Sequence, residues 1–250
     1  MNNHIHYPQT VSTNTILKEL MQQNLQLPQF TVVSAGYQTS GRGQRQNIWE
    51  SEADRNLLFT ILLTPGALPA SEAFAVSKIV SVAIAGWLQT FVEDVKIKWP
   101  NDIYSGNKKI CGILIENSMM GANLSSAVVG VGININQTNF SSALPNPTSL
   151  SLLTHKKYNL EEMLEGVVEE IKRCYSCYFE EGEEKVNSTY HNMLYRLNKL
   201  AKYNIINSSS SEKKMEEATI IGVEQNGCLR LKYADTKVCT YAFKEVEFVL

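Results

Sequence analysis

The sequence predicts an α+β protein in which a domain of strands and helices is followed by a small C-terminal β-barrel. Two observations predict this class. Up to residue 201, apolar runs of strand character alternate with segments of helical periodicity. From 202 to 250 only short strand patterns remain, which is typical of a small barrel appended to a larger domain. We therefore expect two domains, residues 1–201 and residues 202–250.

The elements of the first domain follow from apolar patterns and the residues that interrupt them. After a frayed N-terminus, Ser12, Thr13 and Asn14 carry hydroxyl and amide groups that suit the start of a helix over 15–21. Helical periodicity predicts further helices, at 71–91, 160–181 and 187–201. Strands are expected at 30–38, 56–64, 95–99, 109–116 and 127–136, with the third and fourth forming a hairpin with a long loop.

The C-terminal segment contains three expected strands, at 215–223, 229–233 and 238–243. Asn226-Gly227 stands between the first two of them. This dipeptide is typical of the tight turn of a β-hairpin, because both central positions of such a turn need positive φ. A hairpin is therefore expected there.

Composition and charge exclude several classes of protein. The 250 residues include 23 Lys and Arg against 25 Asp and Glu, and this net charge of −2 argues against a nucleic-acid footprint over the whole surface. No apolar run approaches the ~18 residues that cross a bilayer, and the N-terminus lacks a signal-peptide pattern. The five cysteines do not indicate a disulfide framework, and Cys174 and Cys177 lie on an apolar helical stripe that favours core packing. We expect a cytoplasmic protein that binds neither nucleic acid nor membranes.

Three common fingerprints are absent from the sequence. There is no G-x-x-x-x-G-K-[ST] phosphate loop and no G-x-S-x-G nucleophile elbow. Gly130-Val131-Gly132 lacks a third glycine and lies inside an expected strand, so the dinucleotide-binding fingerprint fails as well. Hydrolase and dehydrogenase functions lose most of their support.

A less common combination of residues remains. One expected strand ends at Gln38 and leads into a glycine loop that carries Arg42 and Arg45. Further along the chain, Asp102 is followed by Lys109, three residues before a glycine. Cations, glycine backbone for close approach and an acid suit a ligand that has a carboxylate together with a nucleoside polyphosphate.

Ordered motifs connect this combination to a known family. Four motifs follow one another along the chain. They are Gly41-Arg42-Gly43 with Trp49 downstream, Lys98-Trp99-Pro100-Asn101-Asp102, Lys109-x-x-Gly112-Ile-Leu-x-Glu116 and Gly130-Val-Gly132-Ile-Asn134. Together with the Ser-Thr-Asn segment and the C-terminal unit, this chain resembles the biotin protein ligases over nearly its whole length. The resemblance implies a mixed β-sheet with helices, related to the class II aminoacyl-tRNA synthetases.

The resemblance also implies a reaction and its partners. Biotin is activated by ATP to biotinyl-5′-AMP, and the biotinyl group then passes to a lysine of a biotin carboxyl carrier protein domain. ATP and biotin are substrates and Mg²⁺ is expected, although the resemblance assigns no protein residue as its ligand. Only about 30 residues precede the first expected strand, too few for the three-helix DNA-binding module of some relatives. We therefore expect the monofunctional form, as a monomer or a homodimer.

Site residues are carried over from the resemblance by position. For catalysis these are Arg42, Lys109 and Asp102, where Asp102 steers the attacking amine or organises the metal. Glycines at 112, 130 and 132 permit close packing of backbone around the ligand. The biotin-binding residues implied are Ser12, Thr13, Asn14, Gln38, Arg42, Gly43, Gln44, Lys109 and Gly112. The nucleotide-binding residues implied are Arg42, Arg45, Trp49, Asn56, Lys109 and Asn134.

The glycine loop departs from the common form of the family, G-R-G-R-x-G-R-x-W. Gln44, Gln46 and Asn47 stand at the second arginine, the third glycine and the third arginine. Two cations are therefore missing. We expect activity to be retained because Arg42 and Lys109 remain.

Two other functions stay open. A lipoate ligase uses similar adenylate chemistry, although its usual R-R-x-S-G-G-G loop is absent here. The altered glycine loop would also fit a catalytically weak biotin-binding regulator. The mass of the carrier after incubation with ATP and either acid separates the two ligases, and release of pyrophosphate with biotin excludes the regulator.

Overall fold

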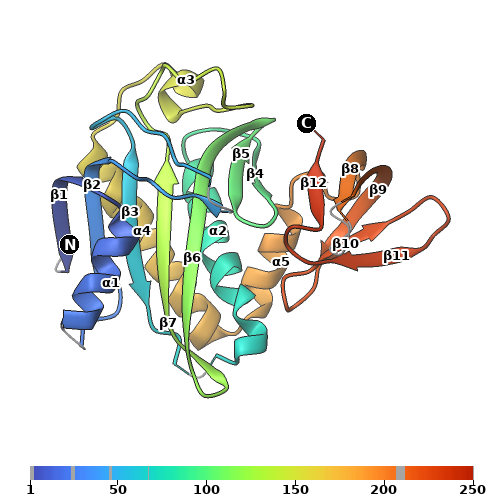
Figure 1. Cartoon of the computed structure of the whole chain (residues 1–250), viewed down its shortest axis with the longest axis horizontal. Helices are drawn as coiled ribbons and strands as arrows, with labels where there is room; N and C mark the ends of the chain where they lie inside the picture. The colour runs from blue at the N-terminus through green and yellow to red at the C-terminus, as the bar shows by residue number, and fades with distance from the viewer. Residues whose placement is uncertain (1–2, 24–25, 45–46, 67, 207–211, 250) are drawn as a thin grey trace.

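The computed structural model of the chain describes residues 3–23, 26–44, 47–66, 68–206 and 212–249 (Figure 1). These residues form a large sheet with helices on both faces and a second, smaller sheet at the C-terminal end. The expected α+β class and the mixed sheet are confirmed.

The large sheet has seven strands in the order β1-β2-β3-β7-β6-β5-β4. Only β1 and β2 pair in parallel, and the other neighbours are antiparallel. The strands are β1 (His4–Thr10), β2 (Val32–Gln38), β3 (Leu57–Leu63), β4 (Val95–Lys98), β5 (Asp102–Ser105), β6 (Lys108–Met120) and β7 (Asn123–Ile133).

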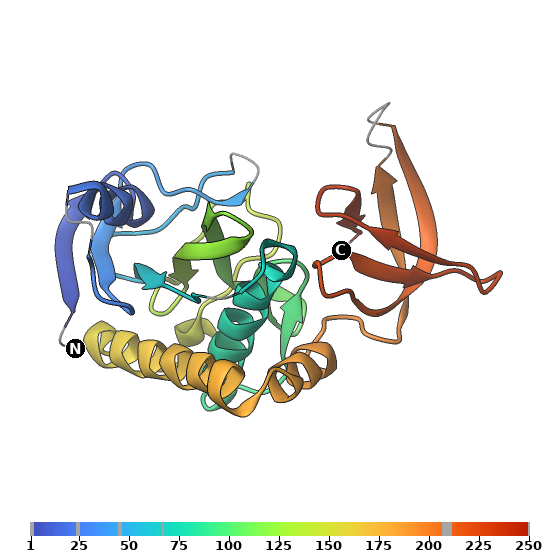
Figure 2. The ribbon, with the colours of Figure 1, turned by 90° about the horizontal axis from the view of Figure 1, so that it is seen from below.

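Helices cover both faces of this sheet. Figure 2 shows α1 on one side and α4 on the other. The helices are α1 (Thr13–Gln23), α2 (Phe74–Gln89), α3 (Leu150–Thr154), α4 (Leu160–Ser176) and α5 (Glu184–Asn192), with a 3₁₀ turn at Ala70–Glu72 and a π-helical turn at Cys177–Glu181. Cys174 and Cys177 are buried, which confirms the expected core packing.

The alternation of side chains along β3 explains why it is apolar throughout. Phe59 and Ile61 join the main core under α2 and α4, whereas Leu62 packs on the opposite face with Leu17 of α1. A strand that is buried on both faces has no position for an exposed polar residue. Thr60, on the α1 face, is fully buried despite its hydroxyl group.

The helix α2 is the central helix of the core. The segment Ala70–Gln89 is long and apolar enough to cross a membrane, although no single apolar run in the sequence had reached that length. Within the span that meets this test, 72% of the residues are buried inside the protein. Its apolar composition is therefore accounted for by packing against α4, α5 and the sheet.

The small sheet contains five antiparallel strands in the order β11-β10-β9-β8-β12. It ends at β11 and β12, so the expected barrel is not closed among the described residues. The expected hairpin at Asn226-Gly227 is confirmed between β9 and β10, but only Gly227 has a positive φ, of 90°, so the turn is not the type that needs positive φ at both positions. The division at 201/202 stays a prediction. The strands are β8 (Leu200–Ile206), β9 (Lys213–Val223), β10 (Leu229–Lys232), β11 (Val238–Tyr241) and β12 (Val246–Phe248).

A buried contact fixes the small sheet beside the end of β4. The indole N–H of Trp99 donates a hydrogen bond of 2.8 Å to the carbonyl oxygen of Gly227 in the β9–β10 turn. The Trp99 ring also makes an edge contact with Phe243 at 6.3 Å between centroids. The small sheet is therefore attached at the Lys98–Asp102 segment.

Several expected elements were wrong in extent or pairing. The segment His4–Thr10, expected to be frayed, is the strand β1, which pairs in parallel with β2. The strands at 95–98 and 108–120 do not form a hairpin, because β5 lies between them and pairs with both. The last helix ends at Asn192 rather than at residue 201, where β8 has already begun. The strand β12 was not expected.

Candidate active site

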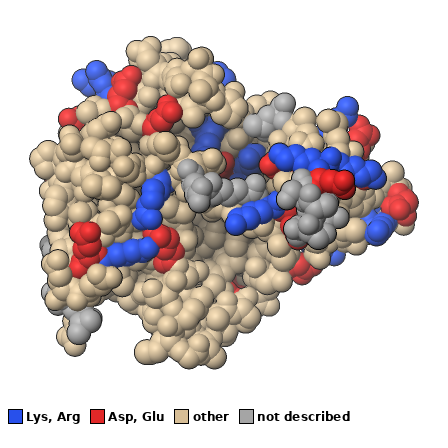
Figure 3. Space-filling view, in the orientation of Figure 1, with Lys and Arg blue, Asp and Glu red and all other residues tan. Residues whose placement is uncertain are grey.

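A cavity of about 300 Å³ lies where β6 and β7 face α1, the glycine loop and the small sheet. Figure 3 shows Lys and Arg side chains around the hollow between the two sheets. Segments far apart in the sequence supply the lining, which includes Ser12, Thr13, Asn14, Gln38, Arg42, Gly43, Gln44, Trp49, Lys98, Asp102, Lys109, Gly112, Gly130, Gly132, Phe243 and Phe248.

Glycines form the floor of the cavity. Gly130 and Gly132 are two residues apart on β7 and so face the same side, and Gly112 of β6 pairs with Gly132. A Cβ at Gly132 would lie 2.4 Å from the Trp49 indole, and one at Gly130 would lie 2.2 Å from the Asn14 side-chain oxygen. The glycines therefore let Trp49 and Asn14 rest directly on the strand backbone.

A network of neutral hydrogen bonds forms one end of the cavity. Gln38 accepts from the Thr13 backbone N–H at 2.8 Å and from its hydroxyl at 3.1 Å. The buried Thr60 hydroxyl lies 2.7 Å from the Thr13 hydroxyl and 2.6 Å from the Asn14 side-chain oxygen. The hydroxyl of Ser12 and the amide nitrogen of Gln38 have no hydrogen-bond partner within the described parts of the chain. These two groups are available to a polar, uncharged ligand group.

Glu116 of β6 lies next to this network. Its carboxylate accepts from the Asn14 amide at 2.8 Å and from Lys18 of α1 at 2.5 Å, and the Arg42 guanidinium is 3.5 Å away. Burial alone would raise the pKa of Glu116, but the hydrogen bonds from Lys18 and Asn14 and the charges of Lys18 and Arg42 outweigh it. The pKa is therefore held below its ordinary value, and Glu116 is ionised at neutral pH.

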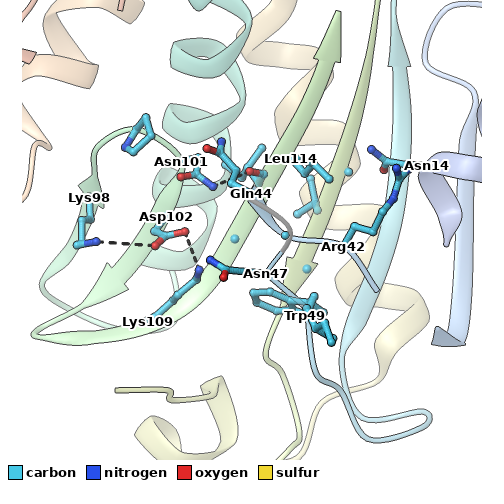
Figure 4. Close-up of a pocket in the computed structure, with 18 of the residues that line it drawn as sticks. Asn14, Arg42, Gln44, Asn47, Trp49, Lys98, Asn101, Asp102, Lys109 and Leu114 are labelled. Carbon is cyan, nitrogen blue, oxygen red and sulfur yellow. Dashed lines mark hydrogen bonds and ion pairs between the residues drawn. The ribbon is translucent and has the colours of Figure 1, made fainter. Parts of the chain in front are cut away.

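A second ionic group forms the other end of the cavity, shown in Figure 4. Asp102, the first residue of β5, lies 2.7 Å from the Lys109 amine and 4.0 Å from the Lys98 amine. The Lys109 amine is also 5.6 Å from the centre of the Trp49 ring, a cation–π distance. Lys109 is thus held between a carboxylate and an aromatic face.

Short backbone hydrogen bonds shape the glycine loop over the cavity. Gly43 N–H donates to the Asn47 carbonyl at 2.7 Å, and Trp49 N–H donates to the Gly41 carbonyl at 2.9 Å. A Cβ at Gly41 would lie 2.6 Å from the Trp49 carbonyl oxygen, so this position needs glycine. The loop folds back on itself and carries Arg42 and Trp49 to the cavity.

The structure brings most of the residues expected from the sequence to this one cavity, including Arg42 and Lys109. Asn56 and Asn134 do not line it. Asn56 donates to Ser51 and Gln137 and accepts from the Ile135 backbone, and Asn134 donates to the Thr148 carbonyl, so both hold chain segments together. Arg45 lies outside the described residues, as does Gln46 of the loop.

Sequence reasoning missed several residues of the site. The apolar run around Thr60 predicts only a buried strand, although a hydroxyl in the middle of such a run indicates a buried polar contact. Glu116 belongs to a motif but was given no role. Phe243 and Phe248 line the cavity from the C-terminal sheet, and no local pattern indicates this, since it depends on how the two sheets pack.

The arrangement suits one class of ligand. The cavity has a neutral polar end, a floor of glycines and cations near both ends. Such a cavity can hold a small acid whose uncharged part is buried at the neutral end. Cations that flank the reacting groups offset the repulsion between a carboxylate and a phosphate. Acyl activation by a nucleoside triphosphate is the chemistry that this geometry favours.

Solved structures of several biotin protein ligases share this fold. The biotin protein ligase of Aquifex aeolicus in complex with biotin and ATP superposes with a TM-score of 0.80 and 22% identity, and covers 100% of this chain and 99% of that chain. The Leishmania major enzyme in complex with biotinyl-5-AMP gives a TM-score of 0.67 and 19% identity, over 97% of this chain and 99% of that one. At these identities the likeness concerns the fold.

Sequence relatives agree with this. The bifunctional ligase/repressor BirA of Bacillus spizizenii is 31% identical over 180 residues, 70% of this chain and 53% of the relative. The biotin–[acetyl-CoA-carboxylase] ligase of Paracoccus denitrificans is 34% identical over 105 residues, 41% of this chain and 43% of that protein. The chain thus spans about half the length of the curated relatives it matches. Residues 7–134, slightly more than half of the chain, match the family model of the biotin/lipoate A/B protein ligases, and the chain belongs to that family.

Proposed function

We propose that this protein activates biotin with ATP and transfers the biotinyl group to a lysine of a carrier protein domain. The observation that carries the proposal is that Arg42 and Lys109, 67 positions apart in the sequence, line one cavity beside a neutral polar network. The named biotin ligases among the relatives support biotin over lipoate as the acid.

In the first step, a biotin carboxylate oxygen forms a bond to the α-phosphorus of ATP, and the bond to the pyrophosphate leaving group breaks. The neutral network of Ser12, Thr13, Asn14 and Gln38 binds the uncharged head of biotin. Lys109 and Arg42 offset the charge where the carboxylate meets the triphosphate, which stabilises the transition state more than the separated substrates. Trp49 borders the nucleotide.

In the second step, a carrier lysine amine attacks the acyl carbon of biotinyl-5′-AMP and AMP leaves. A lysine with a pKa of ~10.4 is neutral in only about one molecule in a few thousand at pH 7. Asp102 attracts the incoming ammonium group and steers it toward the reacting carbon. The proton is released to solvent or to Asp102 as the amide bond forms.

The residues of the cavity do not form a site for Mg²⁺ by themselves. Among the described residues, no group of three or more His, Cys, Asp or Glu side chains could hold a metal ion. Asp102 is already paired with Lys109, and Glu247 at the cavity is paired with Lys213. Mg²⁺ that accompanies ATP would take its ligands from phosphate oxygens and water, as this ion commonly does.

We also propose a cytoplasmic location. All five cysteines are free in the structure, including the half-exposed Cys228 and Cys239 of the small sheet. Unpaired cysteines are typical of proteins in a reducing compartment. A carboxylase carrier domain in the same compartment is the proposed partner.

The experiment that tests the proposed function is transfer to a carrier. The protein is incubated with ATP, biotin and an isolated biotin carboxyl carrier domain, and the domain is then analysed with streptavidin and by intact mass. We expect one biotinyl group on the carrier, at its target lysine. A carrier in which that lysine is replaced by arginine is the control, and it should stay unmodified.

Two outcomes would contradict the proposal. Addition of a lipoyl group, but no biotinyl group, when the two acids are offered separately would make the protein a lipoate ligase. Tight biotin binding without pyrophosphate release would make it a binding regulator rather than an enzyme.

A further inference from the structure

Glu116 is clamped by one face of α1. Asn14 and Lys18 are four residues apart on that helix, so both side chains lie on the same face. Asn14 donates to Oε2 of Glu116 at 2.8 Å, and Lys18 is 2.5 Å from Oε1. Each carboxylate oxygen of Glu116 therefore already has a close partner. Neither Glu116 nor Lys18 lines the cavity.

Arg42 is the third partner of the same carboxylate and the most weakly held. Its guanidinium lies 3.5 Å from Oε2 of Glu116 and 3.4 Å from the Thr15 hydroxyl, both at the long limit of a hydrogen bond. Its side chain is 45% exposed. In Figure 4 it extends toward Asn14, away from Lys109. To meet an anion near Lys109, the guanidinium must leave Glu116.

We propose that Glu116 holds Arg42 in a resting position and that Lys18 keeps this hold weak, so that Arg42 is available to the anionic substrate. Lys18 and Glu116 are thus positioning residues that act through Arg42, and the proposal rests on the proposed function. The two cations compete for one carboxylate. Because Lys18 is the closer of them, Arg42 is the one that is released when an anion enters.

The consequence is an effect on affinity from a lysine outside the cavity. If Lys18 is removed, Glu116 keeps its charge and turns to Arg42, so a smaller fraction of the protein has Arg42 available. Apparent affinity for the anion falls by that fraction. If Glu116 is neutral, there is no competition, and the loss of Lys18 has no route to Arg42.

The test is a double-mutant cycle with Lys18→Met, Glu116→Gln and the double variant. Glutamine can still accept the hydrogen bond from Asn14. The dissociation constant of ATP is measured by calorimetry with and without biotin, and biotin-dependent ATP–pyrophosphate exchange gives the KM for ATP and kcat. We expect Lys18→Met to weaken ATP binding and raise its KM about 3–10-fold, with a smaller change in kcat. In the Glu116→Gln background, Lys18→Met should change neither the dissociation constant of ATP nor the KM for ATP.

Lys172→Met is the matched control, because Lys172 of α4 also forms a close lysine–glutamate ion pair, 2.7 Å from Glu169, far from the cavity. It should leave ATP binding unchanged. Equal weakening by Lys18→Met in both backgrounds would show simple long-range attraction and overturn the proposal. The proposal would also be overturned if Lys18→Met had no effect on ATP binding in either background, or if no variant bound ATP detectably. If ATP binding follows the cycle but no exchange occurs in the wild type, the proposed function fails while this inference stands.

Discussion

The two ends of the cavity each combine one carboxylate with two cations, but they distribute them differently. At one end Asp102 is 2.7 Å from Lys109, which lines the cavity, and 4.0 Å from Lys98. At the other end Glu116 is closest to Lys18, outside the cavity, and holds Arg42 at 3.5 Å. Among the cations that line the cavity, Lys109 is therefore closely paired with Asp102, whereas Arg42 is loosely paired with Glu116.

This difference indicates a division of labour. Lys109 is fixed by Asp102 and by the ring of Trp49, so it offers a charge that needs no rearrangement when the substrates meet. Arg42 is exposed and weakly held, so it can follow a ligand. Under the proposed function, the neutral network at the Glu116 end would hold the uncharged part of the ligand, and the charged groups would act on the reacting part.

The largest effect is expected at the fixed cation. Lys109→Ala should lower biotin-dependent ATP–pyrophosphate exchange about 100–1,000-fold, because a preorganised charge at the reacting atoms is lost. Exchange kinetics measure this directly. Lys108→Ala, which removes the neighbouring exposed lysine, is the control and should have no effect. Near-normal exchange by Lys109→Ala would remove Lys109 from the mechanism.

Substitutions of the two glycines in the cavity floor should affect the two ligands differently. Gly130→Ala would place a methyl group 2.2 Å from the Asn14 oxygen, and Gly132→Ala would place one 2.4 Å from the Trp49 indole. We expect Gly130→Ala to weaken biotin binding about 10–100-fold with a smaller effect on ATP, and Gly132→Ala to show the reverse. Calorimetry with each ligand, together with melting temperatures, checks this. Identical losses for both ligands in both variants would contradict the division.

A smaller effect is expected from the hydroxyl under the neutral network. Thr60→Val keeps the shape of the side chain but removes the contacts to Thr13 and Asn14. The loss of about 1–2 kcal/mol should appear as a roughly 10-fold weaker affinity for biotin and an unchanged KM for ATP. Thr64→Val, which removes a hydrogen bond to Gln29 from the residue just after the same strand, should leave both unchanged.

The smallest effect concerns the stability of the Glu116 end. Because the folded pKa of Glu116 is lowered, its contribution to the free energy of unfolding is present above its unfolded pKa and is lost as pH falls through the folded pKa. The ion pair is partly exposed, so wild type should exceed Glu116→Gln by only ~0.5–1 kcal/mol at pH 7. Denaturant unfolding should show this difference shrinking below about pH 4.5. A constant difference across this range would contradict the assignment.

The sequence predicts the fold best where the pattern is local. The apolar run of β3 and the turn at Asn226-Gly227 follow from neighbouring residues. The strand β1 could not be predicted, because its polar residues become a strand only through parallel pairing with β2, more than twenty positions away. The four residues of β5 follow a proline and an asparagine, and only their pairing with β4 and β6 makes them a strand.

The site shows the same limit. The ordered motifs are sufficient to predict that Arg42, Gly112 and Lys109 belong to one site. They could not reveal that Asn14 rests on Gly130 between Thr60 and Glu116, because this depends on the register of three strands under one helix. The motifs also failed to separate residues that line the cavity from those, such as Asn56, that support the chain behind it.

The central claim is that one cavity brings an acid and a triphosphate together, and isotope exchange between ATP and pyrophosphate tests it most directly. We predict exchange that requires biotin, is absent with lipoate in its place and is lowered about 100–1,000-fold by Lys109→Ala. Exchange that ignores biotin, or that continues undiminished without Lys109, would contradict it.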